Sequence, residues 1–216
     1  MSHLNFYWLW LAANPLFILA VFLVLRAPFT HKADRVTNWA GSLIKGMDQI
    51  SETTIALVKW FALGMVLITT ALVLGRYVFG VGSLKGQEAV IYMHGLLFLL
   101  SAAATLLHNG HVRVDVVYSR LSTANKAWVD LLGTGLFLIP VCLVILIFSD
   151  GYVARAWQIT EGSPEVDGLP WVYLLKSVIP VFAIMVLLQG SAQSLRAALT
   201  LAGHPLPAAK AHAEMI

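Results

Sequence analysis

The sequence predicts an all-α integral membrane protein, built as a bundle of helices that cross the bilayer. Hydrophobic residues make up 59% of the 216 residues and charged residues 12%, whereas soluble domains hold roughly 45–50% and about 25%. Four uninterrupted apolar runs occupy residues 55–75, 89–107, 131–149 and 171–189. Each is as long as the roughly 17–25 helical residues that cross a bilayer, and most charges lie between them. A soluble fold is therefore excluded.

Composition also narrows the classes of function. Cys142 is the one cysteine and lies inside an apolar run, so an intrachain disulfide or a cysteine-rich metal site is excluded. The net charge is +3, but Lys and Arg are scattered and form no single patch, so we expect no nucleic-acid partner. The apolar runs leave no room for a large soluble catalytic module. We predict no enzyme activity, no catalytic residue, no cofactor and no metal site.

The distribution of Lys and Arg predicts how the spans are oriented. Nine of the 14 Lys and Arg residues lie in three segments that share one side of the membrane if the spans alternate. There are four in residues 26–53, three in 108–127 and two in 190–216. The connections on the other side hold three, which are Arg76, Lys85 and Arg155. The positive-inside rule then places the richer side, with the C-terminus, in the cytoplasm.

An N-terminal run at residues 7–26 predicts an extra crossing that is kinked at Pro15, because proline inside a helix removes a backbone hydrogen bond. Aromatic residues at its start and Arg26 at its end suit the two membrane interfaces. In the alternative, Asn14 caps a helix that begins at Pro15 and is too short to cross. A signal peptide is disfavoured, since no Lys or Arg precedes the run.

The segment between this run and the next is amphipathic. Apolar residues recur at spacings of three and four from Val36 to Ile50, and polar residues fill the other face. This period predicts an amphipathic helix. Lys and Arg at its margins favour a position along the cytoplasmic membrane surface. The alternative is a cytoplasmic extension of the next span, with the same apolar face against lipid or a partner.

Two features of the run at 89–107 concern packing. Residues 101–105 are all small, and small residues mark contact surfaces between membrane helices. His94 is the one histidine well inside a run, and we interpret it as a hydrogen-bonding core residue. A haem with two axial histidines would need a second one at matching depth, which no other run supplies.

Several segments resemble a known family: HVRVD at residues 111–115, GRYVFG at 75–80, GLPWVYLLKSVIPV at 168–181, and Glu88 near the head of its run. Together they resemble the small membrane subunit of tripartite ATP-independent periplasmic (TRAP) transporters, the DctQ-like family. HVRVD is the most specific motif, because the family carries it on the cytoplasmic side, where the charge distribution independently places it. The resemblance covers roughly residues 47–199.

The resemblance implies three regions. Residues 1–46 form an N-terminal extension with the extra span and the amphipathic linker, 47–199 form a DctQ-like domain of four membrane helices, and 200–216 form a cytoplasmic tail. The extension departs from the usual small subunit, which has four spans. We expect a multi-pass protein of the bacterial inner membrane, with a periplasmic N-terminus and a cytoplasmic C-terminus.

The resemblance also implies partners and a function. The chain would be a small permease subunit that scaffolds a large, DctM-like membrane subunit within the lipid bilayer. That assembly takes up organic acids, driven by an ion gradient, from a periplasmic substrate-binding protein of the DctP type. In such systems the substrate and ion sites belong to the large subunit. The alternative is a membrane anchor of a haem- or quinone-linked redox complex, suggested by His94 and the Trp-rich interfaces.

Carried over to this sequence, the family pattern implies a cytoplasmic interfacial elbow at His111, Arg113 and Asp115. It places the start of the last span at Pro170, Trp171 and Lys176. After the elbow, Ser122 is a candidate N-cap for the following helix.

The outer loop before the last span is acidic, with Glu161, Glu165 and Asp167. We hypothesise that these three residues help to receive the binding protein. The alternative is that the acids are solvated and only reflect the position of this loop on the outer side of the membrane. Lys176 lies about a turn inside the last run, where it either snorkels to the interface or pairs with one of these acids.

Overall fold

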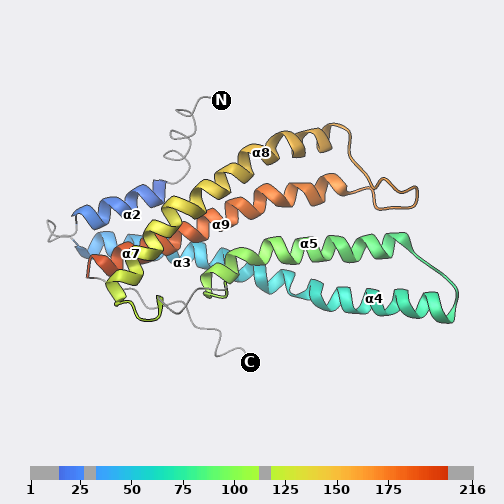
Figure 1. Ribbon diagram of the computed structural model, residues 1–216, viewed down its shortest axis with the longest axis horizontal. Coiled ribbons are helices and arrows are strands. Elements are labelled where there is room, and N and C mark those ends of the chain that lie inside the picture. Colours follow the sequence, from blue (N-terminus) through green and yellow to red (C-terminus); the bar gives the residue numbers. More distant parts are fainter. Residues whose placement is uncertain (1–14, 27–32, 112–117, 204–216) are drawn as a thin grey trace.

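The computed structural model describes residues 15–26, 33–111 and 118–203, and these are helical apart from short connections. No strand occurs in the described ranges, so the all-α prediction is confirmed. The helices are shown in Figure 1. They are α2 (Pro15–Arg26), α3 (Ala33–Val58), α4 (Trp60–Val78), α5 (Leu84–Leu107), α7 (Thr123–Gly133), the π-helical turn η2 (Thr134–Leu138), α8 (Ile139–Gln158) and α9 (Val172–Leu201).

The four predicted spans are confirmed as four helical stretches that are long and apolar enough to cross a membrane. All four are longer than the apolar runs, two of them by the most because neighbouring helices join. α3 continues into α4 with one irregular turn at Lys59, so residues 37–78 form one candidate span. Likewise, α7, η2 and α8 together make one stretch.

The amphipathic segment belongs to α3, which is continuous across residues 46 and 47. Its apolar residues Ala40, Ile44 and Met47 are buried in a cluster with residues of α9. The segment is therefore a helical extension of the next span, the second of the two interpretations. Part of its apolar face packs on the chain itself, while Trp39 and Ile50 are about half exposed.

Four helices lie in a row, in the order α4, α5, α9 and α8 (Figure 1). α5 packs between α4 and α9, and α8 packs on the other side of α9. Within the described residues, α4 makes no comparable contact with α9 or α8. The membrane part is therefore closer to a single layer of helices than to a closed bundle, and it has two broad faces.

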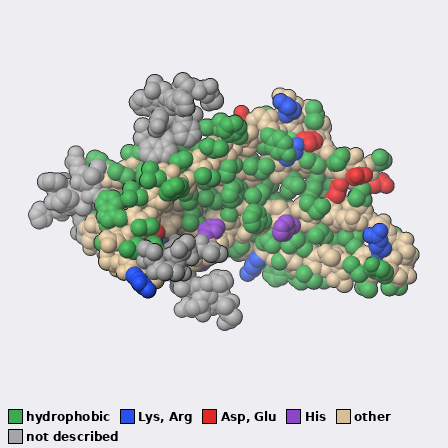
Figure 2. Space-filling model, in the orientation of Figure 1, with side chains coloured by type: hydrophobic (Ala, Val, Ile, Leu, Met, Phe, Trp, Pro, Cys, Tyr) green, Lys and Arg blue, Asp and Glu red, His purple; other side chains and the backbone are tan. Residues whose placement is uncertain are grey.

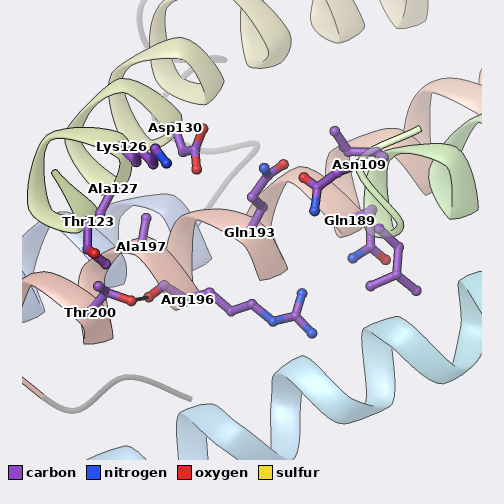
Figure 3. Close-up of a pocket in the computed structure, with 12 residues that line it drawn as sticks. Asn109, Thr123, Lys126, Ala127, Asp130, Gln189, Gln193, Arg196, Ala197 and Thr200 are labelled. Carbon is purple, nitrogen blue, oxygen red and sulfur yellow. Dashed lines mark hydrogen bonds between the residues drawn. The ribbon is translucent and has the colours of Figure 1, made fainter. Parts of the chain in front are cut away.

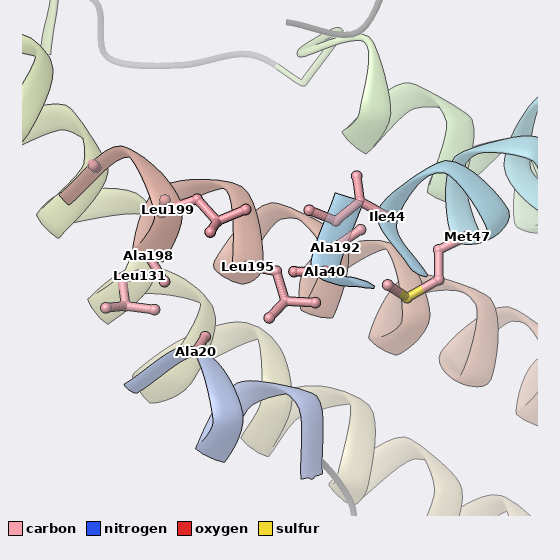
Figure 4. Close-up of a cluster of buried hydrophobic side chains, with 11 residues drawn as sticks. Ala20, Ala40, Ile44, Met47, Leu131, Ala192, Leu195, Ala198 and Leu199 are labelled. Carbon is pink, nitrogen blue, oxygen red and sulfur yellow. The ribbon is translucent and has the colours of Figure 1, made fainter. Parts of the chain in front are cut away.

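The two ends of the row differ. At one end lie the connections 79–83 and 159–171, and we call this the loop end. At the other end, which we call the basal end, α2, α3 and α7 pack around the last turns of α9. A hydrophobic cluster fills this basal end (Figure 4). It is centred on Leu195, which is fully buried, and on Ala192, Ala198 and Leu199 of the same helix.

The π-helical turn η2 precedes a proline. Ile139 N–H donates to the Thr134 carbonyl, five residues back, and Pro140 follows, which has no N–H to donate. Such turns widen a helix locally. Here the turn is a packing site, because a side chain at Gly135 would overlap the ring of Phe17 in α2, and one at Gly190 would lie within 2.8 Å of Leu138.

The predicted N-terminal crossing is described only in its second half. α2 has 12 residues, or about 18 Å of helix, against a hydrocarbon core of about 30 Å. Ala20 packs into the basal cluster beside α9. Residues 7–14 lie outside the described residues, so the crossing over 7–26 stays a prediction.

Candidate functional site

Glu88 in the first turns of α5 holds the outer loop in place. Its carboxylate accepts hydrogen bonds from the Ser163 hydroxyl and, at 2.5 Å, from the Leu169 backbone N–H. Gly168 is required at this point, because a Cβ there would overlap the Ser163 hydroxyl. The Glu88 carboxylate thus joins the connection 159–171 to a helix about 80 residues earlier in the chain.

Lys176 in α9 pairs with an acid of the same loop, as one of the two interpretations predicts. Its Nζ donates to both carboxylate oxygens of Glu161, at 2.7 and 2.5 Å. The same Nζ lies 4.0 Å from the centroid of the Tyr152 ring in α8, a cation–π arrangement. Glu161 is therefore engaged within the chain.

The other two acids of the loop are exposed. Glu165 and Asp167 line a cleft of about 440 Å³ at the loop end. Its opposite wall is the α4–α5 connection, with Lys85 at its edge. Val166, between the two acids, is fully exposed. Figure 2 shows acidic side chains gathered at this end of the molecule.

The last span begins slightly later than predicted. Trp171 occupies the N-cap position of α9, and Pro170 precedes it. The Trp171 carbonyl accepts from the N–H groups of Leu174 and Leu175, at 3.1 and 3.2 Å. Pro170 and Trp171 are both exposed, so they lie at the surface just outside the helix.

The predicted elbow is only partly described. His111 is exposed and lines an apolar groove together with Tyr118 and Phe137. Arg113 and Asp115 lie outside the described residues, so their role stays a prediction. The N-cap that follows is confirmed, because the Ser122 hydroxyl accepts from the Asn125 N–H at 3.3 Å.

A polar network near the basal end was not predicted from the sequence. Asp48 of α3 accepts hydrogen bonds from Arg196 and from the Gln189 side-chain amide, the latter at 3.1 Å. The Ser51 hydroxyl donates to the side-chain amide oxygen (Oε1) of Gln189 at 2.7 Å. Gln189 is only 1% exposed. Two features of the sequence could have indicated this network. Asp48 and Ser51 are spaced to share one face of α3, and Gln189 lies at the end of an apolar run.

A cavity of about 230 Å³ adjoins this network (Figure 3). It is lined by polar residues from three parts of the chain: Asn109 at the end of α5, Lys126 and Asp130 of α7, and Gln193 and Arg196 of α9. The Asp130 carboxylate accepts from the Tyr118 hydroxyl at 2.9 and 3.1 Å, and Arg196 is paired with Asp48. The hydrogen bonds of the network therefore join α3 to α9 beside the cavity.

His94 is not the core residue that the sequence analysis expects. Its side chain is exposed on α5 and stacks on Phe98, with ring centroids 6.4 Å apart. Length and periodicity place a residue on a helix, but they do not say which face a neighbouring helix covers.

The described structure is a row of membrane helices. Glu88 fixes the connection 159–171 at one end, and the polar network of Asp48, Gln189 and Arg196 lies near the other. A model of the family described as tripartite ATP-independent periplasmic transporters, DctQ component, matches residues 65–200. These residues are more than half of the chain.

The chain belongs to the DctQ family. The family match begins in α4 and ends in the last turn of α9, so it includes the connection 159–171 and most of the row of helices. DctQ proteins are the small permease subunits of TRAP transporters, and this membership implies association with a large DctM subunit and a periplasmic binding protein. No curated protein and no solved structure matched the chain.

Proposed function

We propose that this DctQ protein scaffolds the large permease subunit of a TRAP transporter in the bacterial inner membrane. The transporter takes up organic acids that a periplasmic binding protein delivers, and an ion gradient drives the uptake. The observation that carries this proposal is the single row of α4, α5, α9 and α8, whose faces are covered by α2, α3 and α7 only towards the basal end. A layer of this shape suits a wall or brace beside a larger membrane protein.

The exposure of α4 supports the same proposal. None of its residues is buried, and large side chains such as Trp60, Leu67 and Tyr77 are more than 60% exposed. Between membrane helices, close packing and not hydrophobic expulsion drives association. A helix that packs along only one of its sides therefore has surface for both lipid and a partner subunit.

The family match favours this function over the redox anchor. That alternative rested on His94 as a possible haem ligand, and His94 stacks on Phe98 at an exposed surface of α5. DctQ proteins are transporter components.

Co-purification tests the scaffold proposal. The tagged chain, co-expressed with the large subunit from the same source and extracted in mild detergent, should retain that subunit through size-exclusion chromatography. An unrelated four-span membrane protein with the same tag is the control. If the large subunit elutes apart from the tagged chain, as it does from the control, the proposal is wrong.

We further propose that Glu165 and Asp167 help the chain to receive the binding protein. Both are exposed in the cleft at the loop end, while Glu161 is paired with Lys176. Reversing both charges, in E165K/D167K, should raise the binding-protein concentration needed for half-maximal uptake, because opposite charges steer protein encounters. The control is D150K, at an exposed residue of α8 outside the cleft. If uptake by both variants depends equally on the binding-protein concentration, the acids are only part of a solvated loop and the docking proposal is wrong.

A further inference from the structure

One stripe of α5 is exposed along most of the helix and has a polar residue at its centre. Gln87, Ile91, His94 and Phe98 are exposed, and Ile91 and Phe98 are 62% and 68% accessible. They follow each other at spacings of four, three and four residues. This is the spacing at which one helix face meets a single partner helix over two turns or more.

The stripe lies in the middle of one broad face of the row. A side chain at Gly86 would meet Leu72 of α4, and one at Gly95 would meet Leu175 of α9. At about 100° per residue, these two directions are about 180° apart, and the stripe points about 80° to 140° from Gly86. α4 and α9 therefore flank the stripe on its two sides without covering it.

His94 also lies near the middle of the candidate span formed by α5. It is about 15 Å of helix from the start of α5 and about 20 Å from its end, in a hydrocarbon core about 30 Å thick. Among the described residues, none forms a hydrogen bond with the imidazole. Its stacking on Phe98 uses the ring face and leaves both ring nitrogens available.

An imidazole at this depth is costly against lipid tails, which offer no hydrogen-bond partner. Polar side chains within membrane helices accordingly face other helices or a water-filled cavity. In the described chain α3, α4 and α9 all pack on α5, but they leave His94 exposed. No group among the described residues satisfies the His94 imidazole, so the partner that suits this exposed face is a helix of another membrane protein.

We propose that the stripe Gln87, Ile91, His94 and Phe98 is the seam along which a transmembrane helix of the large subunit packs, with a hydrogen-bonding side chain opposite His94. This inference rests on the proposed function and specifies where the two subunits meet. Charged and strongly hydrated partners are disfavoured at this depth. The matching residue on the partner helix is a neutral donor or acceptor, such as a Ser, Thr, Asn or Gln side chain.

Site-specific photo-crosslinking in membranes that contain the whole transporter tests the seam. A photoreactive residue at Ile91 or Phe98 should give an adduct with the large subunit. The control is Phe148 on α8, which is 77% exposed at the far edge of the row. Adducts from 148 with none from 91 and 98 would overturn the seam. Absence of adducts from all three positions would also overturn it, and co-purification would then decide separately whether the scaffold proposal survives.

Substitution of His94 tests the hydrogen bond. His94→Leu should weaken retention of the large subunit by about threefold to fifteenfold, the range measured for hydrogen bonds between membrane helices. His94→Gln, which keeps a donor and an acceptor, should recover most of it. Thermal stability of the isolated subunit should be unchanged or higher in His94→Leu. Equal or stronger retention by the Leu variant would mean that His94 faces lipid, and the proposal would fail.

Discussion

Three charged side chains near the ends of the spans pair with groups on another element of the chain. Lys176 meets Glu161, Glu88 meets the loop at Ser163 and Leu169, and Arg196 meets Asp48. Near the membrane such pairs keep charges out of the hydrocarbon without leaving them unsatisfied. Each pair also fixes one element against another, so these residues position the loop end and the basal end.

The pair Asp48 and Arg196 should contribute measurably to stability, because both side chains are about four-fifths buried. Removing one partner, as in Arg196→Met, should lower the free energy of unfolding by about 2 to 4 kcal/mol, since a poorly solvated carboxylate remains. Denaturant unfolding in detergent, followed by circular dichroism, measures this. Lys45→Met, at an exposed position of the same helix as Asp48, is the matched control.

The double variant Asp48→Leu/Arg196→Met separates the interaction between the two charges from the cost of burying each of them. It should be less destabilised than the sum of the two single variants, because the stranded charge is gone. Strict additivity would show that the two groups do not interact in the folded protein.

At this scale the sequence predicted some contacts and missed others for a clear reason. Lys176 is only 15 residues from Glu161 and lies on the same predicted side of the membrane, so local spacing and topology sufficed. Asp48 and Arg196 are 148 residues apart. Their pairing depends on how α3 packs against α9, and a pattern within either helix does not contain that information.

At the scale of the elements, the glycine of η2 controls how α2 joins the row. The π-helical turn presents Gly135 to the Phe17 ring, and no side chain fits between them. Proline at position 140 explains why the helix is irregular here, but the sequence alone did not reveal that α2 uses the irregular turn as its docking point.

Gly135→Ala should therefore detach α2 or shift it. We expect a loss of about 1 to 3 kcal/mol from overpacking and faster proteolysis near α2. Gly133→Ala, two residues earlier on the same helical stretch, is the matched control, because its Cβ would meet nothing within 4 Å. That variant should be neutral or more stable by up to about 1 kcal/mol, since Ala favours helix. Equal effects of the two substitutions would contradict the packing described here.

The lengths of the elements show where sequence patterns stop being informative. The apolar runs located all four spans, because a run of that length has no other stable solution in lipid. They left open whether the amphipathic segment joins the next span, since Asp48, Glu52 and Lys59 interrupt the apolar pattern there; in the structure α3 and α4 form one candidate span. Burial of the apolar face of α3 against α9 overrides that interruption.

At the scale of the whole molecule, a row of helices has edges and faces that a closed bundle lacks. This difference explains the exposure of α4 and of His94, and it gives the chain its surface for a partner. The charge distribution predicts an orientation, with the loop end in the periplasm and the basal end in the cytoplasm.

Cysteine labelling tests this orientation. Val81→Cys lies in an exposed part of the α4–α5 connection, and Ala124→Cys is exposed in the first turn of α7. A membrane-impermeant thiol reagent added to intact cells with a permeabilised outer membrane should label position 81 and not position 124. The native Cys142 is buried and provides the background. Labelling of position 124 alone would reverse the predicted topology.

The central claim is that this chain braces a transporting partner and carries no cargo itself. Substrate uptake into proteoliposomes, with the binding protein and an ion gradient present, tests it most directly. The account predicts uptake when both membrane subunits are reconstituted, and none with either subunit alone. Full uptake by the large subunit without this chain, or any uptake by this chain alone, would contradict it.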